Sequence, residues 1–473
     1  MVPSGCLIGD TWVTNAEMID VRNPADGTLV GQVPSLGAAH TQQAIDAAAL
    51  ALPGWAARTA NERAEILMRF HALILGHESA LAALLTAEQG KPLSEAVGEI
   101  RYAARFIEWF AEEGKRIDGR VICPEDADKR ILAIKQPVGV VAAITPWNFP
   151  AAMVTRKVGP ALAAGCTVIL KPAELTPLTA LALGALARQA GLPDGVLNII
   201  TGDPATIGKV LTASPVVRKL SFTGSTATGA LLYAQCAPTV KKLSLELGGN
   251  APFIVFDDAD IEAAVVGAIQ SKFRNAGQTC VCANRFYVQA GVYDEFVGSF
   301  SNSVSRLRVG AGDIEGNQIG PLIDEAAIAK VERHIADATD KGARVTTGGA
   351  RHPSGPLFFT PTVLADANGT MLATQEETFG PVAPVIRFDT EAEMIAHANH
   401  TPFGLAAYFY TRDITRVWRV AEAVEAGMIG VNTGLISTAV APFGGVKSSG
   451  LGREGAREGI EEYLETKMVC MAL

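Results

Sequence analysis

Between residues 138 and 247, short apolar runs rich in β-branched residues alternate with helical stretches, and this alternation constrains the fold more than any other feature. Five runs are expected to form strands: 138–144, 166–170, 197–200, 219–222 and 241–247. Helices are expected near 151–164 and 176–190 and after the third and fourth strands. Strands that alternate with helices predict a parallel sheet covered on both faces. The sequence therefore predicts a doubly wound α/β domain, an architecture that binds nucleotides at the carboxyl ends of its strands.

Further regions flank this pattern. Residues 1–35 contain turn signals and predict short strands, whereas residues 40–115 are rich in Ala, Leu, Glu and Arg and predict helices. A second α/β region is expected from about residue 252 to about residue 448. The β-like segment 462–470 could pair with a sheet edge, including one on another subunit.

Charge and composition argue against several classes of protein. Apolar residues make up 48% of the 473 residues and charged residues 19%, which suits a globular protein of two or three domains. The net charge of −9 argues against a nucleic-acid binder, because no basic excess is available to neutralise phosphates. No stretch of about 18 uninterrupted apolar residues exists, so no membrane span is expected.

The cysteines and the first residues bear on the compartment. The seven cysteines are an odd number, thinly scattered, and no Cys/His pairs have zinc-site spacing. They predict no disulfide framework, no metal site and a reducing, cytoplasmic compartment. The segment MVPSGCLIGDTW lacks a basic stretch followed by an apolar run, so no signal peptide is expected.

Two residues could carry covalent chemistry. Cys280 ends the segment Gly-Gln-Thr-Cys, and a cysteine becomes a nucleophile only if its pKa is lowered or a base assists it. The alternative for an arbitrary cysteine is a buried apolar side chain. Glu246 ends an apolar strand just before Gly248 and Gly249, where a carboxylate is costly unless it is paired or functional. The alternative is a salt-bridged residue at the end of a strand.

Polar residues also follow the other predicted strands. Asn148 lies between aromatic residues and prolines, and a rigid amide there could stabilise an oxyanion or could merely cap the next helix. Lys171 follows the second strand, where nucleotides bind in such sheets, and Glu174 is close enough to reach a ribose hydroxyl. The alternative for Lys171 is a solvated charge. The segment 224–229 opens a helix with small residues, which suits a pyrophosphate, although its spacing is not that of the usual glycine motif.

Taken together and in this order, seven segments resemble the aldehyde dehydrogenase superfamily over nearly the whole chain: PWNFP, KPAE, FTGST, LELGG, GQTC, EETFGPV and PFGGVKSSG. The resemblance implies a Rossmann-type cofactor domain, an α/β catalytic domain and a small β oligomerisation element. It places the cofactor domain at 1–117 and 138–247, the catalytic domain at 248–448, and the oligomerisation element at 118–137 and 449–473. A homodimer or homotetramer is expected.

The resemblance also implies the roles of individual residues. Cys280 would be the nucleophile and Glu246 the general base, while Asn148 and the Cys280 backbone N–H would form the oxyanion hole. The residues implied in cofactor binding are Thr145, Pro146, Trp147, Lys171, Glu174, Gly224, Ser225, Glu377 and Phe379. Cys280 would attack the aldehyde to form a thiohemiacetal, hydride transfer to the nicotinamide would leave a thioester, and Glu246 would activate the water that releases the acid.

Within the superfamily the sequence is similar to succinate-semialdehyde dehydrogenases. Arg156, Arg274 and Ser437 match the positions that hold the distal carboxylate of the substrate in that subfamily. Guanidinium groups present a planar fork that suits a carboxylate. The alternative is a pair of solvated helix arginines. Glutaric semialdehyde is one methylene longer, which is worth only about 1–3 kcal/mol of discrimination, so it remains an alternative substrate.

Two further expectations concern regulation and the cofactor. Cys282 lies two residues from Cys280, and some relatives form a reversible disulfide at this spacing, although a small buried cysteine is an equal alternative. Glu174 should attract a free ribose 2′-hydroxyl and repel a 2′-phosphate, so NAD is favoured and NADP is the alternative. A CoA-acylating dehydrogenase would not need Glu246, and a non-catalytic relative would not need Cys280, so both are less favoured functions.

Overall fold

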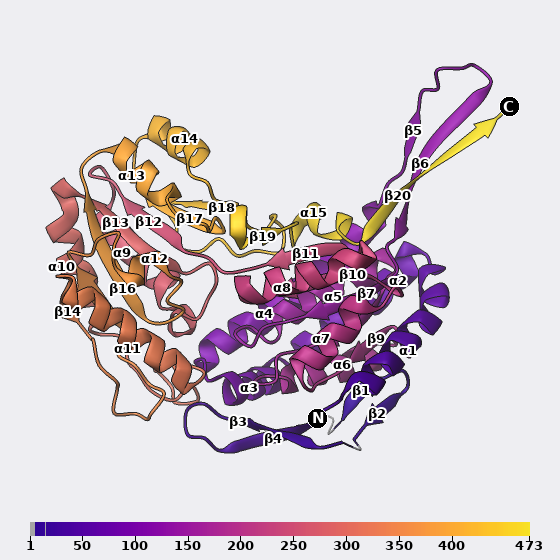
Figure 1. The fold of residues 1–473 in the computed structure, drawn as a ribbon, viewed down its shortest axis with the longest axis horizontal. Coiled ribbons are helices and arrows are strands. Elements are labelled where there is room, and N and C mark those ends of the chain that lie inside the picture. The colour runs from indigo at the N-terminus through magenta and orange to yellow at the C-terminus, as the bar shows by residue number, and fades with distance from the viewer. Residues whose placement is uncertain (1–4, 15) are drawn as a thin grey trace.

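The computed structural model describes residues 5–14 and 16–473, and it consists of two α/β lobes and a projecting arm (Figure 1). The first lobe contains an eight-stranded sheet in the order β19-β11-β10-β7-β8-β9-β1-β2. Its five central strands are parallel: β7 (Val140–Ile144), β8 (Thr167–Lys171), β9 (Leu197–Ile199), β10 (Val217–Thr223) and β11 (Lys242–Glu246). Each predicted strand is present. Because the strand order reverses between β7 and β10, their carboxyl ends mark the point where a doubly wound sheet binds ligands.

The helices of this lobe also follow the prediction. The connections between the parallel strands are α5 (Ala152–Ala164), α6 (Leu178–Gln189), α7 (Pro204–Ala213) and α8 (Thr226–Cys236). The preceding helices are α1 (Ala38–Ala56), α2 (Ala60–Gly76), α3 (Glu78–Gln89) and α4 (Leu93–Glu113). All 13 residues of α5 are buried, since this helix lies between the sheet and helices α2 and α4. Any charged residue on α5 must therefore find its partner inside the protein.

Antiparallel strands complete the edges of the first sheet. β1 (Cys6–Ile8) pairs with β9 and with β2 (Thr11–Val13), and β19 (Gly450–Leu451) pairs with β11. A separate hairpin joins β3 (Met18–Arg22) and β4 (Leu29–Pro34). The expectation of early strands thus holds, but residues 1–4, which the signal-peptide expectation includes, lie outside the described residues.

The second lobe contains a seven-stranded sheet in the order β14-β15-β16-β13-β12-β17-β18. Its strands are β12 (Ala251–Val255), β13 (Ala283–Gln289), β14 (Arg344–Thr347), β15 (Thr362–Ala365), β16 (Val382–Phe388), β17 (Ala406–Tyr410) and β18 (Met428–Val431). Its helices are α9 (Ile261–Lys272), α10 (Tyr293–Val304), α11 (Glu325–Asp340), α12 (Leu372–Gln375), α13 (Glu391–Asn399) and α14 (Ile414–Ala423). All pairs are parallel except β14 with β15, and β12, β15 and β17 are buried along their whole length, as expected for a sheet covered on both faces.

The arm is a three-stranded antiparallel sheet that extends away from both lobes (Figure 1). It consists of β5 (Arg120–Ile122), β6 (Lys129–Pro137) and β20 (Leu464–Ala472), and β20 pairs with β6 along its whole length. Val121, Met468 and Leu473 expose 81%, 66% and 74% of their surface on this arm, so it carries unburied apolar side chains. Helix α15 (Ala456–Glu461) precedes β20.

The predicted α/β fold class is confirmed, whereas the domain boundaries stay a prediction. One segment departs from them, because β19 lies within the stretch assigned to the oligomerisation element and yet pairs with β11 in the first lobe. No single helix of the described chain is long and apolar enough to span a membrane, and the pair α2 and α3, bent by 71°, passes that test only in combination. All seven cysteines are free thiols, with Cys123 and Cys470 exposed on the arm.

Candidate active site

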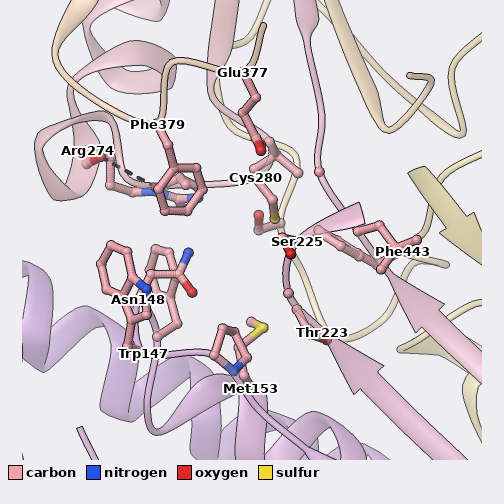
Figure 2. Close-up of a pocket in the computed structure, with 18 of the residues that line it drawn as sticks. Trp147, Asn148, Met153, Thr223, Ser225, Arg274, Cys280, Glu377, Phe379 and Phe443 are labelled. Carbon is pink, nitrogen blue, oxygen red and sulfur yellow. Dashed lines mark hydrogen bonds between the residues drawn. The ribbon is translucent and has the colours of Figure 1, made fainter. Parts of the chain in front are cut away.

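A cavity of about 310 Å³ lies at the carboxyl ends of β7 and β10, between the two lobes. It is lined by most of the residues that the sequence singled out: Pro146, Trp147, Asn148, Arg156, Gly224, Ser225, Arg274, Cys280, Glu377, Phe379 and Ser437. Five others do not line it: Thr145, Lys171, Glu174, Glu246 and Cys282. Figure 2 shows the sulfur of Cys280 and the amide of Asn148 directed toward the middle of the cavity.

The nucleophile lies on a sharply turned loop between α9 and β13. Three successive residues, Asn275, Ala276 and Gly277, have φ values of 51°, 54° and 79°, in the left-handed region that non-glycine residues avoid. A side chain at Gly277 would place its Cβ 2.3 Å from the Gly380 carbonyl, so only glycine fits. Gln278 anchors the turn, because its amide donates to the Asn275 and Pro321 carbonyls and accepts from the Ile323 N–H. The loop is thus held in a strained shape by its surroundings.

The surroundings of Cys280 favour the protonated thiol over the thiolate. Burial, and after it the Glu377 carboxyl, raise the pKa of the Cys280 thiol to about 12, against the opposing effect of the guanidinium groups of Arg156 and Arg274. A thiol with this pKa needs a base or a change in its surroundings before it can attack. The sulfur faces a cavity that Asn148 and Arg274 also line, and this arrangement does not favour the alternative of an inert core cysteine.

Asn148 lies in the loop after β7, and hydrogen bonds hold both its side-chain amide and its backbone carbonyl. Its side-chain Nδ2 donates to the Gln278 carbonyl at 3.0 Å, and its own carbonyl accepts from Lys91 Nζ at 2.7 Å and from Asn275 Nδ2 at 3.1 Å. One Nδ2 hydrogen is used, so the second is free to point into the cavity. An amide fixed in this way can donate to a developing oxyanion without reorganising.

Glu246 ends β11 beside the cavity and belongs to a buried cluster of charges. Its neighbour Glu454 lies 2.6 Å from Lys157 Nζ and 3.1 Å from Arg156 Nε, and all four side chains are buried. Glu246 Oε2 has no hydrogen-bond partner among the described residues. Burial, and then the charge of Glu454, raise the pKa of the Glu246 carboxyl well above its usual value. A carboxyl of this kind is a stronger base once ionised, which suits proton transfer from water. Glu454 and Lys157 were not singled out from the sequence as functional residues.

The residues expected to bind a dinucleotide gather at the same edge of the first sheet. Ser225 is the N-cap of α8, and the helix lies close to the strands, since a Cβ on Gly229 would lie 2.4 Å from Leu247. Lys171, at the end of β8, forms an ion pair with Glu174, and its carbonyl accepts from the Thr145 N–H. A helix N-terminus, small residues and polar groups at strand ends fit a dinucleotide phosphate and its ribose.

Glu377 and Phe379 form the opposite wall of the cavity. Glu377 accepts from the Gly249 N–H at 2.9 Å, and burial raises the pKa of its carboxyl to about 7. Phe379 has a φ of 53°, and this strained backbone sets its ring edge-to-face against Trp147 at a centroid distance of 5.6 Å. Figure 2 shows these two rings together on one side of the cavity, which leaves a slot bounded by flat apolar surfaces.

The cavity also contains the three residues expected to hold a carboxylate. Arg156 is 2% exposed, stacks on Phe443 at 3.9 Å and is partly neutralised by Glu454, although its Nη2 has no partner among the described residues. Arg274 packs over Phe149 at 5.4 Å and forms no ion pair with residues 5–14 or 16–473. The alternative of a solvated helix arginine does not describe Arg156, which is buried, whereas Arg274 is partly exposed, lines the cavity and is the more available cation.

Tyr102 on α4 was missed by the sequence analysis. Its ring lies in the cavity lining, and its hydroxyl is buried without a hydrogen-bond partner among the described residues. Burial raises the pKa of this phenol, while the charges of Arg156 and Arg274 lower it, so the three groups are neighbours. In the sequence Tyr102 is one aromatic among the apolar residues of a helix, and nothing in that pattern distinguishes it from a core residue.

Cys282 does not face the cavity. Its sulfur lies 3.0 Å from the Ser271 carbonyl and 3.1 Å from the Lys272 carbonyl, at the end of α9. A disulfide with Cys280 would require this thiol to leave those carbonyls and the loop to turn. The redox partnership of Cys282 stays a prediction.

The chain is similar to known proteins over nearly its whole length. Residues 12–469 match the model of a family described as the aldehyde dehydrogenase family. A succinate-semialdehyde dehydrogenase [NADP(+)] from Escherichia coli strain K12 is 62% identical over 99% of this chain and 97% of its own length. A glutarate-semialdehyde dehydrogenase from Pseudomonas aeruginosa is 59% identical over 98% of this chain and 96% of its own.

A solved structure agrees with these matches. The crystal structure of a succinate-semialdehyde dehydrogenase from Burkholderia pseudomallei superimposes with a TM-score of 0.99 at 59% identity, and it covers 100% of this chain and 98% of its own. The likeness therefore extends over both lobes and the arm.

Proposed function

This chain belongs to the aldehyde dehydrogenase family, and we propose that it oxidises succinic semialdehyde to succinate, with a nicotinamide dinucleotide as the hydride acceptor. The observation that carries the choice of substrate is Arg274, a cation without an ion-pair partner among the described residues, in the same cavity as Cys280. Arg274 is only partly exposed, and a cation that faces a cavity without an ion-pair partner favours a ligand that brings a negative charge.

The residues of the chain divide the chemistry between them. Cys280 releases its proton to solvent, and the thiolate forms a carbon–sulfur bond with the aldehyde carbon, while the carbonyl oxygen becomes an oxyanion. Asn148 Nδ2 and the backbone N–H of Cys280 donate to that oxygen. The bound nicotinamide supplies the site that accepts hydride. Glu246 takes a proton from water, the water oxygen attacks the thioester carbon, and the carbon–sulfur bond breaks to free the acid and the Cys280 thiolate.

Glu246 lies beside a buried network of polar and charged groups. Glu246 adjoins Glu454, which binds Lys157 Nζ, and Lys157 Nζ also donates to Ser221 Oγ at 3.0 Å. A hydrolytic base supported in this way argues against transfer of the acyl group to CoA, where no water-activating carboxylate is needed. Cys280, Glu246 and Asn148 together argue against a non-catalytic role.

A panel of aldehydes tests the proposal. Succinic semialdehyde should have a kcat/KM well above that of butanal, which has the same carbon chain without the carboxylate. Equal kcat/KM values for the two aldehydes would contradict a binding site for the carboxylate. Glutaric semialdehyde belongs in the panel as the second candidate substrate, because two relatives are named glutarate-semialdehyde dehydrogenases and one methylene changes binding by only about 1–3 kcal/mol.

We propose NAD as the preferred cofactor. The Glu174 carboxylate should repel a ribose 2′-phosphate, although its ion pair with Lys171 weakens that repulsion. The Escherichia coli relative is named for NADP(+), so cofactor choice is a point at which the two proteins could differ. Steady-state kinetics with both cofactors decide it, and a lower KM for NADP would show that Lys171 outweighs Glu174.

The arm supports a proposal about assembly. Its two outer strands, β20 and β5, have free edges within the described chain, and its apolar side chains are exposed. Sheet edges and apolar surface of this kind are usually covered by another chain. We propose a homodimer or homotetramer formed through the arm, to be measured by sedimentation, and a cytoplasmic location consistent with seven free thiols.

A further inference from the structure

A buried ion pair outside the cavity contacts the oxyanion donor from behind. Lys91 and Glu99 are 1% and 4% exposed, and Lys91 Nζ lies 2.6 Å from Glu99 Oε2. Neither residue lines the cavity, so neither touches a substrate there. Lys91 Nζ also donates to the backbone carbonyl of Asn148 at 2.7 Å and lies 3.8 Å from the centre of the Phe149 ring. The ammonium group therefore fixes the peptide that follows Asn148.

The second oxygen of Glu99 holds the next segment of the chain. Glu99 Oε1 accepts from the N–H groups of Ala151 and Ala152 at 2.9 Å and 3.2 Å, where α5 begins without a side-chain cap of its own. One carboxylate thus binds both the start of α5 and the lysine that holds Asn148. The loop that carries Asn148 is tied down on both sides.

A second carboxylate on the same face of α4 holds the nucleophile loop. Glu95 lies four residues before Glu99, a spacing that puts both on one side of the helix. Glu95 Oε2 accepts from the Asn275 N–H at 2.8 Å, and Asn275 Nδ2 in turn donates to the carbonyls of Asn148 and Gln278. Helix α4 therefore sets the Asn148 loop and the Cys280 loop against each other.

Stability alone does not account for this ion pair. Buried ion pairs contribute little net stability, because desolvation of the two charges offsets their attraction. Misplacing a catalytic group by about 1 Å, in contrast, can cost on the order of 10²-fold in rate. Because this pair lies directly behind the oxyanion donor, we expect it to matter more for the position of Asn148 than for stability.

We propose that Lys91 and Glu99 are positioning residues for oxyanion stabilisation: their ion pair holds the Asn148 peptide so that its amide faces the carbonyl bound at Cys280. The inference rests on the proposed chemistry at Cys280. It predicts that Lys91 acts on turnover only through Asn148.

A double-mutant cycle tests this prediction. Lys91→Met should lower kcat about 10-fold to 100-fold with little change in the aldehyde KM. In an Asn148→Ala background the same substitution should change kcat less than about threefold, because the group it positions is gone. A purely structural role would lower kcat by the same factor in both backgrounds and would overturn the proposal.

Two further variants guard against misfolding. Lys91→Met leaves Glu99 as an unpaired buried charge, so the pair Lys91→Met with Glu99→Gln removes both charges together and should fold while still losing kcat. Arg101→Met is the matched control, since Arg101 lies on the same helix and forms an exposed pair with Glu78. Normal kcat in the doubly neutral variant would also overturn the proposal.

The outcomes separate this inference from the function on which it rests. If the unmodified protein oxidises no aldehyde, the proposed function fails. If it oxidises aldehydes and Asn148→Ala is impaired while Lys91→Met is not, only the positioning role fails. Thermal unfolding of each variant shows whether a loss of kcat accompanies a loss of stability.

Discussion

The two ends of the cavity differ in how their polar groups are satisfied. At the reacting end, the loops that carry Asn148 and Cys280 are joined by hydrogen bonds through Asn275 and Gln278. At the distal end, the hydroxyl of Tyr102 and Nη2 of Arg156 have no hydrogen-bond partner within the described chain, and Arg274 has no ion pair there. The loops of Asn148 and Cys280 are therefore held together before a substrate arrives, whereas the distal end lacks a negative charge.

This difference separates rate from specificity. Groups that stabilise a transition state must be fixed in advance, because reorganisation during the reaction would consume their benefit. Groups that select a substrate work by being left unpaired when the wrong substrate binds. Substitutions at the reacting end should therefore affect every aldehyde, whereas substitutions of Arg274 and Tyr102 at the distal end should affect only aldehydes with a carboxylate.

The largest effect is expected at Glu246. Glu246→Gln cannot take a proton from water, so thioester hydrolysis should slow by about 10²–10⁴. Only the ionised carboxyl acts as a base, and its pKa is raised by burial and by Glu454, so hydrolysis by the unmodified protein should speed up as pH rises through that raised pKa. The variant should lose this rise. Stopped-flow absorbance should still show a burst of reduced cofactor, and loss of the burst would place Glu246 in the activation of Cys280 instead.

Asn148→Ala should have the next largest effect. Removal of one oxyanion donor typically costs about 10²–10³ in rate, and succinic semialdehyde and butanal should lose turnover by a similar factor. Steady-state kinetics with the two aldehydes measure it. Unchanged turnover would show that the oxyanion is stabilised elsewhere, and a loss confined to one aldehyde would contradict the division between the two ends.

Arg274→Ala should act on one substrate only. A hydrogen bond to a charged group contributes about 1.5–3 kcal/mol, so kcat/KM for succinic semialdehyde should fall by roughly 10-fold to 100-fold while butanal is unaffected. Arg156→Ala is the informative contrast, because it leaves Glu454 with one cation fewer and should affect both aldehydes. If Arg274→Ala lowered kcat/KM equally for both aldehydes, Arg274 would have a structural role and would not bind the carboxylate.

Tyr102→Phe should have the smallest effect. The change removes only the hydroxyl, and KM for succinic semialdehyde should rise about fivefold to tenfold, as expected for one hydrogen bond. Because that hydroxyl has no partner in the described chain, its removal should also raise the unfolding temperature slightly in the absence of substrate. A lower unfolding temperature would mean that the hydroxyl is already satisfied, for example by water.

The sequence predicts the strands and the residues at their ends because both signals are local. β7 to β11 were readable from runs of apolar residues, and Lys171, Ser225 and Glu246 stand where those runs stop. The order of parallel strands then brings such residues to one edge of the sheet. Residues of this kind can be proposed before a structure exists.

Residues that act across the fold leave no such signal. Glu99 follows the helical pattern of α4 and resembles any charge on a helix face, but it is buried by the packing of α5. Asn275 has a left-handed backbone conformation, and the residues next to it in the sequence do not predict that conformation. Glu454 lies almost 300 positions beyond Lys157, and only the tertiary fold pairs them. These contacts depend on long-range packing, which neither periodicity nor spacing encodes.

The two exposed thiols of the arm have a consequence for labelling experiments. Cys123 and Cys470 face solvent, whereas four other thiols are buried and Cys280 lies in the cavity with a raised pKa. An alkylating reagent should therefore react first with Cys123 and Cys470. The number of thiols that react is then not equal to the number of active sites. A fluorophore attached at Cys470 would instead report on whatever covers β20, so the same chain offers one reactive group for following catalysis and another for following assembly.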